Sequence, residues 1–487
     1  MTLPLLPPKY SSQLENIFLF QLHKYVNHRD LGNEKIFQFV IKELKSLQSK
    51  GLFIKYKDKQ LKIYFPLLSI LGDNLALNKN LGYNSCNSNY PCRICTELKE
   101  EIKYSIGEKE KYLRSISDAK NDKNGIVDDC FFNEIPGYNR FLNCAFDPSH
   151  DLDEGVCRYV MGNILNTIIF LEKRITLDSL NSRISGLNYI SDSNVIPSLT
   201  ADNIKQKYLI VSCSEMFFLI EYLGLLIGDH IPINHKAWKL YLLLRKIMFI
   251  VYMESFNDEI LNDLDNSIIS HNMLYIKLYG HLTVKFHNLG HYVKFIKRMG
   301  PPKFYCTIRC EGRHRLFKSY ANVMNSRLNP EYSLALKNQF PLAYRFFDSE
   351  GFVDRLILGK VIKNTKEFPC YYKFVHLISN NKMLENYELV TSVRVAGTLY
   401  KENYIISYKD ININFAKIKF ILVNKDSVYL LVFKLKIKKY EKHYGAFCVE
   451  ETEETAILNH SCCLPSPTVI NILKDGKKYV TTRVFTM

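Results

Sequence analysis

The sequence predicts a mixed α/β fold built from three kinds of segment, and three observations support this. Strand and helix signals alternate over roughly the first 75 residues. Helical spacing of apolar residues dominates from Gly155 to about Met299, and short β-branched and aromatic segments follow beyond about residue 365. Because 487 residues exceed one ordinary domain, we expect an α/β core, a helical insertion and a small all-β C-terminal domain.

The composition indicates a soluble globular protein with an excess of positive charge. Hydrophobic residues make up 47% and charged residues 23% of the chain. The formal net charge of +16 favours nucleic acid or an anionic membrane surface, and a basic protein without such a partner is the alternative. The apolar runs Met216–Ile227 and Leu240–Met253 predict buried helices, because the first is too short to span a bilayer and the second carries Arg245 and Lys246.

Cysteine usage predicts an intracellular protein with reduced thiols. The chain has 13 cysteines, an odd number, and its first ten residues lack the basic start and unbroken apolar run of a secretory signal. A subset of these thiols is therefore expected to bind metal rather than to form disulfides. The cysteine usage argues against a secreted disulfide scaffold, and the short or charged apolar runs argue against a membrane-spanning protein.

The N-terminal segment predicts a β-α-β-β arrangement. Leu14–Leu22 has the character of a buried strand, and Asn33–Leu47 carries apolar residues at helical spacing. Leu52–Tyr56 and Leu61–Leu71 predict a hairpin whose second strand is long, buried and followed by Asp73. A carboxylate at the end of a strand suits the metal or nucleotide chemistry of α/β proteins.

The rest of the chain divides into a charged run, helices and strands. Residues 99–125 predict a charged, solvated helix followed by a loop. Helices are expected over Val160–Phe170, Ile204–Ile227, Ala237–Met253, Asn257–Phe295 and Cys306–Met324. Strands of a small barrel or sandwich are expected over Tyr387–Val395, Thr398–Ser407, Lys417–Asn424, Ser427–Lys436, Ala446–Val449 and Tyr479–Phe485.

Two pairs of residues suggest a zinc site. Cys92 and Cys95 have the two-residue spacing that lets both sulfurs reach one tetrahedral zinc, although a redox motif or chance would give the same pattern. His287 and His291 stand at i and i+4, so on a helix they face the same way. The alternative for the histidines is an ordinary helix face.

Asp147 and His150 compete as the second half of that site. A carboxylate and an imidazole on one loop can bind metal, and a hydrogen-bonded turn is the alternative. The residues alone therefore leave the partner of the cysteine pair open.

Asp73 and Glu311 suggest a second kind of metal chemistry. Phosphodiester transfer commonly uses divalent metals held by carboxylates. Glu311 lies among cations that would suit a phosphate backbone, namely Arg309, Arg313, His314, Arg315 and Lys318. The alternative for Glu311 is helix pairing with Arg315 at i+4.

Five segments in order resemble the motif blocks of CACTA (En/Spm-like) DDE transposases, most closely the animal versions. The resemblance covers roughly residues 10–345, and the β-rich tail is similar as well. Its blocks are ILGDNLALNKNLGY (70–83), NYPCRIC (89–95), FDPSHDLDEGVCRY (146–159), KFHNLGHY (285–292) and RCEGRHRLFK (309–318).

The resemblance implies an RNase H-like core interrupted by an all-helical insertion. It implies that Asp73 is the second catalytic Asp and Glu311 the catalytic Glu, with Mg²⁺ or Mn²⁺ as the catalytic metal. It also implies one structural zinc held by Cys92, Cys95, His287 and His291, and it leaves Asp147 and His150 as second-tier site residues. The predicted segments are 1–98 and 286–350 for the core, 99–285 for the insertion and 365–487 for the β-rich domain.

The sequence departs from the family at its start. The first catalytic Asp of such proteins lies on a central strand that would precede Leu5–Ser12, and Met1 falls just before that segment. Loss of a central strand exposes unpaired backbone groups, so we expect an RNase H-like core that is incomplete at its N-terminus. This departure suggests an N-terminally truncated gene model, or a decaying or repurposed copy.

The sequence therefore predicts a transposase-derived DNA-binding protein of the nucleus. With two of three carboxylates, it is not expected to cut and join DNA robustly. The expected partner is DNA, either transposon ends or chromatin, with no membrane and with a homo-oligomer left open. A domesticated, non-catalytic nuclear module that binds DNA or chromatin is the alternative, and a pseudogene product without function is a third hypothesis.

Overall fold

The chain folds into two compact units. The computed structural model describes residues 2–482 apart from 4–5, 8–9, 11–12, 116–123, 188–194, 348–350, 352–355, 363–370, 380–386, 396, 410–411, 425–426, 465–466 and 474–475. Unit 1 comprises Met1–Val156 and Val251–Gly351, and unit 2 comprises Cys157–Ile250 and Phe352–Met487. Within the described ranges, no helix is both long and apolar enough to cross a membrane. The functional division of the chain into four segments stays a prediction.

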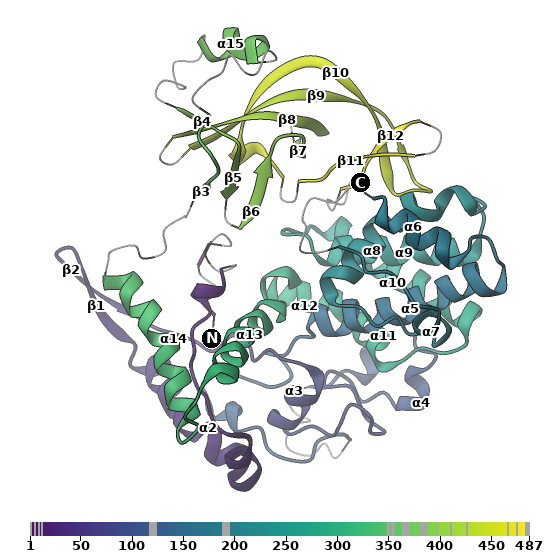
Figure 1. Ribbon diagram of the computed structural model, residues 1–487. Helices are drawn as coiled ribbons and strands as arrows, with labels where there is room; N and C mark the ends of the chain where they lie inside the picture. Colours follow the sequence, from purple (N-terminus) through teal and green to yellow (C-terminus); the bar gives the residue numbers. More distant parts are fainter. Residues whose placement is uncertain are drawn as a thin grey trace. The chain divides into compact units, whose positions relative to one another are not determined.

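Unit 1 begins with a long helix and a projecting hairpin (Figure 1). Helix α2 spans Tyr25–Ser49, with a kink at Gly32, and confirms the helix expected over residues 33–47. Its apolar face buries Ile36, Val40 and Ile41, and Phe37 packs against Phe132 with ring centroids 5.2 Å apart. The helical periodicity of this segment therefore marks a real core face.

The hairpin differs from its prediction. Strands β1 (Leu52–Tyr56) and β2 (Lys59–Ile63) pair antiparallel, and all of their residues are exposed. The long buried strand expected over residues 61–71 is wrong, because the strand ends at Ile63. The strand expected at residues 14–22 is also wrong, since this segment holds only the short 3₁₀ helix η1 (Leu14–Asn16).

The physical reason is the lack of neighbouring strands. In the described part of unit 1, β1 and β2 are the only strands, so apolar segments on either side have no ladder to join. Backbone donors and acceptors pair into a sheet only when a second strand lies beside them. A mixed α/β composition is therefore observed, whereas an RNase H-like core sheet is not seen in the described part of this unit.

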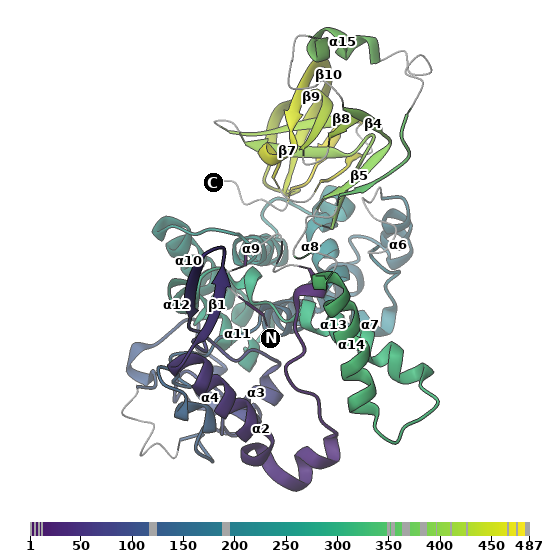
Figure 2. The same ribbon diagram turned by 90° about the vertical axis from the view of Figure 1, so that its left-hand side faces the viewer.

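The remaining elements of unit 1 are short helices and three longer ones, α10, α13 and α14. The charged run of residues 99–125, expected to form a helix followed by a loop, holds only α4 (Lys99–Ile102) and η2 (Glu110–Tyr112) in its described part, and residues 116–123 lie outside that part. The helix expected over residues 257–295 is divided at Gly280, whose φ is 105°. Helices α13 and α14 pack side by side (Figure 2). The elements are α3 (Asn74–Asn80), α4 (Lys99–Ile102), η2 (Glu110–Tyr112), η4 (Phe131–Glu134), η5 (Ser149–Val156), α10 (Asp258–Tyr279), α11 (Val284–Leu289), α12 (Tyr292–Met299), η8 (Pro302–Phe304), α13 (Ile308–Val323) and α14 (Pro330–Phe347).

Unit 2 begins with a helical layer whose two longest helices are buried. The apolar runs near residues 216 and 240 form core helices α8 and α9, as the sequence predicts. Ser212 and Glu215 form a capping box that fixes the start of α8. The elements are α5 (Cys157–Leu165), η6 (Asn166–Leu171), α6 (Leu177–Ser185), α7 (Ala201–Lys205), α8 (Cys213–Ile227), η7 (Gly228–His230) and α9 (Lys236–Val251).

The C-terminal part of unit 2 is antiparallel β-structure, which confirms the predicted β-rich region. One sheet has the order β11-β12-β10-β9-β8-β4 with β7 also paired to β8, and a second has the order β3-β5-β6. The strands are β3 (Ile357–Leu358), β4 (Glu388–Val390), β5 (Ser392–Val395), β6 (Thr398–Lys401), β7 (Ile405–Lys409), β8 (Ile413–Asn424), β9 (Ser427–Glu441), β10 (Ala446–Asn459), β11 (Ile470–Ile472) and β12 (Lys478–Val480).

Both faces of the large sheet are covered. Val393 and Tyr400 of the small sheet share one buried cluster with residues of β8 and β9. Helix α15 (Tyr372–Ser379) lies on another core cluster, where its Phe374 packs against Phe420. The sequence did not predict this helix. Two antiparallel sheets therefore share a common core, as the β-rich region predicted from the sequence requires.

The helical and β parts of unit 2 are joined at the turn between β9 and β10. Trp238 Nε1 donates to the carbonyl of His443 at 3.0 Å, and Arg245 Nη2 donates to that of Gly445 at 2.6 Å. A Cβ on Gly224 would lie 1.9 Å from the Tyr444 carbonyl oxygen, so only glycine permits this approach. The helices of residues 157–250 therefore belong with the C-terminal sheets.

Candidate metal centre and carboxylate site

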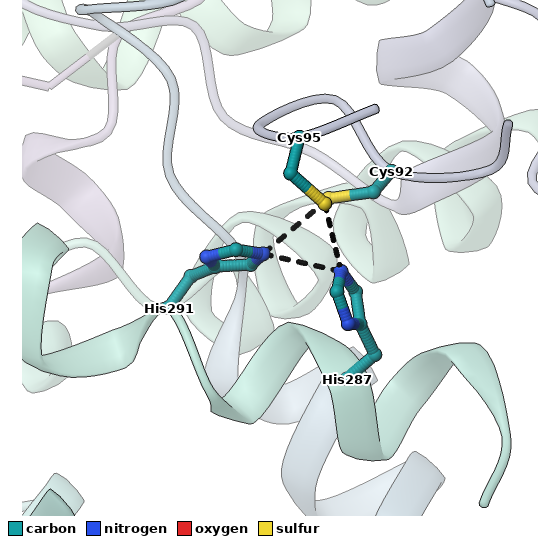
Figure 3. A group of neighbouring side chains, drawn as sticks. All are labelled: Cys92, Cys95, His287 and His291. Carbon is teal, nitrogen blue, oxygen red and sulfur yellow. Dashed lines mark hydrogen bonds between the residues drawn. The ribbon is translucent and has the colours of Figure 1, made fainter. Parts of the chain in front are cut away.

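The four predicted zinc ligands lie together in unit 1. Cys92 and Cys95 come from the loop before α4, and His287 and His291 come from α11 and its junction with α12 (Figure 3). Their side chains are almost fully buried, and one ligand atom of each lies within 4.8 Å of all the others. This is the only such group of three or more Cys, His, Asp or Glu residues within the described ranges.

The distances suit one tetrahedral ion. Cys95 Sγ lies 3.2 Å from His287 Nε2, Cys92 Sγ lies 3.6 Å from His291 Nε2, and the two Nε2 atoms lie 3.2 Å apart. Ligands bound to zinc at about 2.0 Å for nitrogen and about 2.3 Å for sulfur are separated by roughly 3.3–3.8 Å. The cluster can therefore hold a metal such as zinc, and the choice of the histidines over Asp147 and His150 is decided.

The cysteine turn is held in place by its neighbours. The Ile94 amide donates to Cys92 Sγ at 3.3 Å, and Cys95 forms an isolated bridge with Leu113. Arg93, which follows Cys92 in the sequence, is buried; its Nη1 donates to Asn78 Oδ1 at 2.8 Å and its guanidinium lies over the Phe146 ring. The side chain between the cysteines is thus part of the core.

The histidines do not lie on one continuous helix. Helix α11 ends at Leu289, and His291 is the N-cap of α12. A Cβ on Gly290 would lie 3.3 Å from the Glu108 amide nitrogen, so the junction runs against the 107–108 backbone. This close approach brings Glu108 to His291.

Carboxylates outside the cluster orient the imidazoles, and the sequence analysis missed them. Glu108 Oε2 lies 2.6 Å from His291 Nδ1, and the buried Glu97 lies 3.7 Å from His287 Nδ1. Metal-binding histidines usually face such an acceptor through the nitrogen that does not bind the metal. Both glutamates lie within 13 residues of Cys95, but only the fold shows which of the acidic residues after Cys95 turn inward.

The thiols and imidazoles of the cluster shift one another's pKa values. Burial disfavours a thiolate at Cys92, but a hydrogen bond from Cys95 and the charges of His291 and His287 lower its pKa well below the usual value. Cys95 keeps its proton, because it donates to Cys92 and is itself buried, and its pKa is raised. Burial opposes a charge on His291, yet the Cys92 thiolate and Glu108 raise its pKa to about 9. A metal would replace these protons.

A second constellation joins Asp147, His150 and Glu311. His150 Nδ1 lies 2.6 Å from Asp147 Oδ2, and His150 Nε2 lies 3.2 Å from Glu311 Oε1. The Asp147 carboxylate also accepts from the Thr307 amide at 2.8 Å and the Thr307 hydroxyl at 2.7 Å. Asp147 and His150 therefore form a hydrogen-bonded pair, which was one of the two predicted alternatives. Through His150 this pair contacts Glu311 on α13.

The charges of this constellation are fixed by burial and hydrogen bonding. Burial alone would raise the pKa of Asp147, but donors from His150, Ser149 and Thr307 outweigh it and lower that pKa. The hydrogen bond to Asp147 raises the pKa of His150 above its usual value, although partial burial works against it. Asp147 is thus an anion that holds a proton on Nδ1 of His150.

Asp73 is placed differently. Its carboxylate accepts from the Ala76 amide at 2.7 Å and caps the N-terminus of α3. Its neighbour Asn74 donates at 2.7 Å to the buried Asp151, which also accepts from Asn288 at 3.0 Å. Segment 147–151 therefore contacts α3, α11 and the start of α13. Among the described residues, however, no ion pair joins Asp73 to Glu311.

The cations of α13 fall into two groups. Glu311, His314, Arg315 and Lys318 are exposed and spaced to share one face of the helix, which we call the α13 face. Arg313 turns instead to Asn338 of α14, and Arg309 is exposed but is not spaced to share the α13 face. Within the described part of the chain Glu311 pairs with His150, and no ion pair joins it to Arg315.

Comparison with known proteins does not identify a family. No protein-family model matches the chain, and no curated protein matches it in sequence. The resemblance to CACTA transposases therefore rests on the motif blocks in the sequence.

Proposed function

We propose that this chain is a zinc-stabilised, DNA-binding protein of transposase ancestry, and that the α13 face contacts the phosphate backbone. The observation that carries the proposal is the Cys₂His₂ cluster, since it joins two of the motif blocks that carry the resemblance. Zinc is the metal that two thiolates and two imidazoles in tetrahedral spacing favour. The nucleus is the compartment that this function implies.

Unpaired positive charge supports the DNA contact. On the α13 face, Arg315 and Lys318 have no ion-pair partner within the described ranges. On the sheet of unit 2, by contrast, Lys434 pairs with Glu454 and Lys438 with Glu450, both at 2.5 Å. Cations already paired with carboxylates gain little from a phosphate, whereas unpaired ones release counterions when they bind DNA.

We further propose that the chain binds DNA without cutting it. The Asp73 carboxylate caps a helix, and the described part of unit 1 lacks the sheet on which a carboxylate triad is normally arranged. Two-metal catalysis needs carboxylates that converge on the scissile phosphate. These observations favour the domesticated, non-catalytic module over an active transposase.

The test is the salt dependence of binding to duplex DNA, measured by fluorescence anisotropy. Each phosphate contact contributes about 0.9 to the slope of log affinity against log salt, so the double variant Arg315→Ala/Lys318→Ala should lower the slope by roughly 2. The matched control is Lys434→Ala/Lys438→Ala, which removes the same charge from paired lysines and should leave the slope unchanged. Equal slopes for wild type and the α13 variant would refute the proposed surface.

A nicking assay tests the non-catalytic part of the proposal. Supercoiled plasmid is incubated with the zinc-loaded protein and Mg²⁺ or Mn²⁺. We expect no nicking above that of the Glu311→Gln variant. Metal-dependent nicking by the wild type that Glu311→Gln abolishes would show instead that the carboxylates still act on DNA.

A further inference from the structure

Helix α14 exposes its most apolar face. Its buried residues are Leu334 and Asn338. Four of its aromatic residues are largely exposed, at 61% for Tyr332, 66% for Phe340, 70% for Tyr344 and 89% for Phe347. A surface helix normally turns its apolar face to the core, so a helix that exposes this face has a surface for a further partner.

The exposed side chains form one continuous stripe. From Tyr332, steps of four residues lead to Leu336, Phe340 and Tyr344, and a step of three leads to Phe347. Residues three or four apart share one face of a helix. We call these five residues the α14 stripe.

Polar contacts hold the other side of α14 against unit 1. Asn338 Oδ1 accepts from Arg313 of α13, and Arg345 Nη2 donates to the Glu15 carbonyl at 3.5 Å. Lys337, which borders the stripe, places its ammonium 5.0 Å from the centre of the Tyr320 ring of α13. The stripe therefore cannot turn inward without breaking these contacts.

The area of the stripe approaches that of a dimer interface. Because a fully exposed aromatic side chain presents roughly 200 Å², the four aromatic residues together expose roughly 550 Å² at their measured fractions. A stable, specific interface buries about 800 Å² on each partner. Leu336 and the residues that flank the stripe supply much of the remainder.

The stripe is complementary to a second copy of itself. Two α14 helices that pack antiparallel about a two-fold axis at Phe340 bring equivalent residues together twice. The opposed pairs are Phe340 with Phe340, Tyr344 with Leu336, Phe347 with Ser333, and Lys337 with Ala343. Large side chains then meet apolar or small ones, and the lysines of the two copies do not face each other.

The distribution of charge favours a second copy over a lipid surface. A helix that lies on a membrane carries lysine and arginine on its polar face, where they reach the headgroups. In α14, Lys337 and Arg345 are directed instead to Tyr320 and to the Glu15 carbonyl.

We propose that the α14 stripe is the contact between two copies of this chain, which pair antiparallel about a two-fold axis at Phe340. Each copy contributes the same residues, so the assembly closes at two chains. The inference goes beyond DNA binding and does not depend on it.

The experiment is sedimentation velocity of the full chain, loaded with zinc, over a series of protein concentrations. We expect an equilibrium between one and two chains. Phe340→Glu places two carboxylates opposite each other at the axis and should weaken the dimer by at least about thirtyfold. Phe39→Glu is the matched control, because Phe39 is 70% exposed on helix α2 and its replacement should leave the dimer unchanged.

A pair of opposite charges tests the antiparallel arrangement. Leu336→Glu and Tyr344→Lys should each weaken the dimer when made alone. The double variant Leu336→Glu/Tyr344→Lys should dimerise at least about tenfold more tightly than either single variant, because the new charges then face each other across the interface. Zinc content and thermal unfolding confirm that each variant is folded.

Three results would overturn the proposal. They are a wild type that stays monomeric at every concentration, a Phe340→Glu dimer as tight as that of the wild type, and a double variant no tighter than its single variants. A monomeric wild type that binds vesicles of phosphatidylcholine and phosphatidylserine, with binding lost in Phe340→Glu, would assign the stripe to a lipid surface instead.

Discussion

The Cys₂His₂ cluster and the carboxylate site of unit 1 both join distant parts of the sequence, yet they differ in how fully the fold surrounds them. All four residues of the cluster are buried, and Glu97 and Glu108 stand behind its histidines. Glu311 is exposed, and Asp73 caps a helix. The difference shows that the four residues of the cluster converge on one point, whereas the two carboxylates that the sequence suggested as a second metal site are not joined by any ion pair among the described residues.

The largest effect is expected when a ligand of the Cys₂His₂ cluster is removed. Cys92→Ser should abolish bound zinc and unfold unit 1, because structural zinc contributes on the order of 10 kcal/mol to the folding of small zinc domains. Zinc content by elemental analysis and thermal unfolding measure the effect. Cys86→Ser, which changes a cysteine outside the cluster, is the control and should keep one zinc. A full complement of zinc in Cys92→Ser would contradict the assignment.

A smaller change tests the carboxylates behind the cluster. Glu108→Gln should weaken zinc binding by about 10–100-fold, because Glu108 accepts the Nδ1 proton of His291 and raises the basicity of its other nitrogen. Competition with a chromophoric chelator measures the affinity. Glu110→Gln, an exposed glutamate two residues later, should bind zinc as the wild type does. Equal affinities for both variants would mean that Glu108 has no part in the centre.

The smallest effect is expected for Asp73, and it tests the carboxylate site rather than the Cys₂His₂ cluster. Asp73→Ala should lower the free energy of unfolding by about 1 kcal/mol, because α3 loses its N-cap. Asp73→Ser keeps an oxygen that can cap the helix and should restore most of that stability. Denaturant unfolding distinguishes the variants. A Ser variant as unstable as the Ala variant would show that the carboxylate has a role besides capping.

The sequence was sufficient where local patterns coincide with burial. Helix α2 follows from its apolar spacing, and α8 follows from its long apolar run and the Ser212–Glu215 capping box. The strands of the C-terminal sheets follow from their β-branched character and turn residues. Such patterns report the face that each element buries, so they need no knowledge of the partner.

The sequence failed where a segment depends on a partner for its structure. Residues 14–22 and 64–71 are apolar and extended in character, yet no neighbouring strand in the described part of unit 1 completes a ladder for them. Helix α15 was missed because its eight residues are stabilised by Phe374 packing on Phe420. In each case the deciding contact comes from residues far away in the sequence.

The metal centre shows the same division. By itself the sequence determined the ligand types, the CxxC spacing and the presence of a histidine pair, because these are local. Only the tertiary structure decided that His287 and His291, rather than Asp147 and His150, complete the cluster, since 192 residues separate Cys95 from His287. The tertiary structure also placed Glu108 against His291, and it placed His150 beside Glu311. Such contacts depend on how loops pack, so no regular spacing of residues in the sequence indicates them.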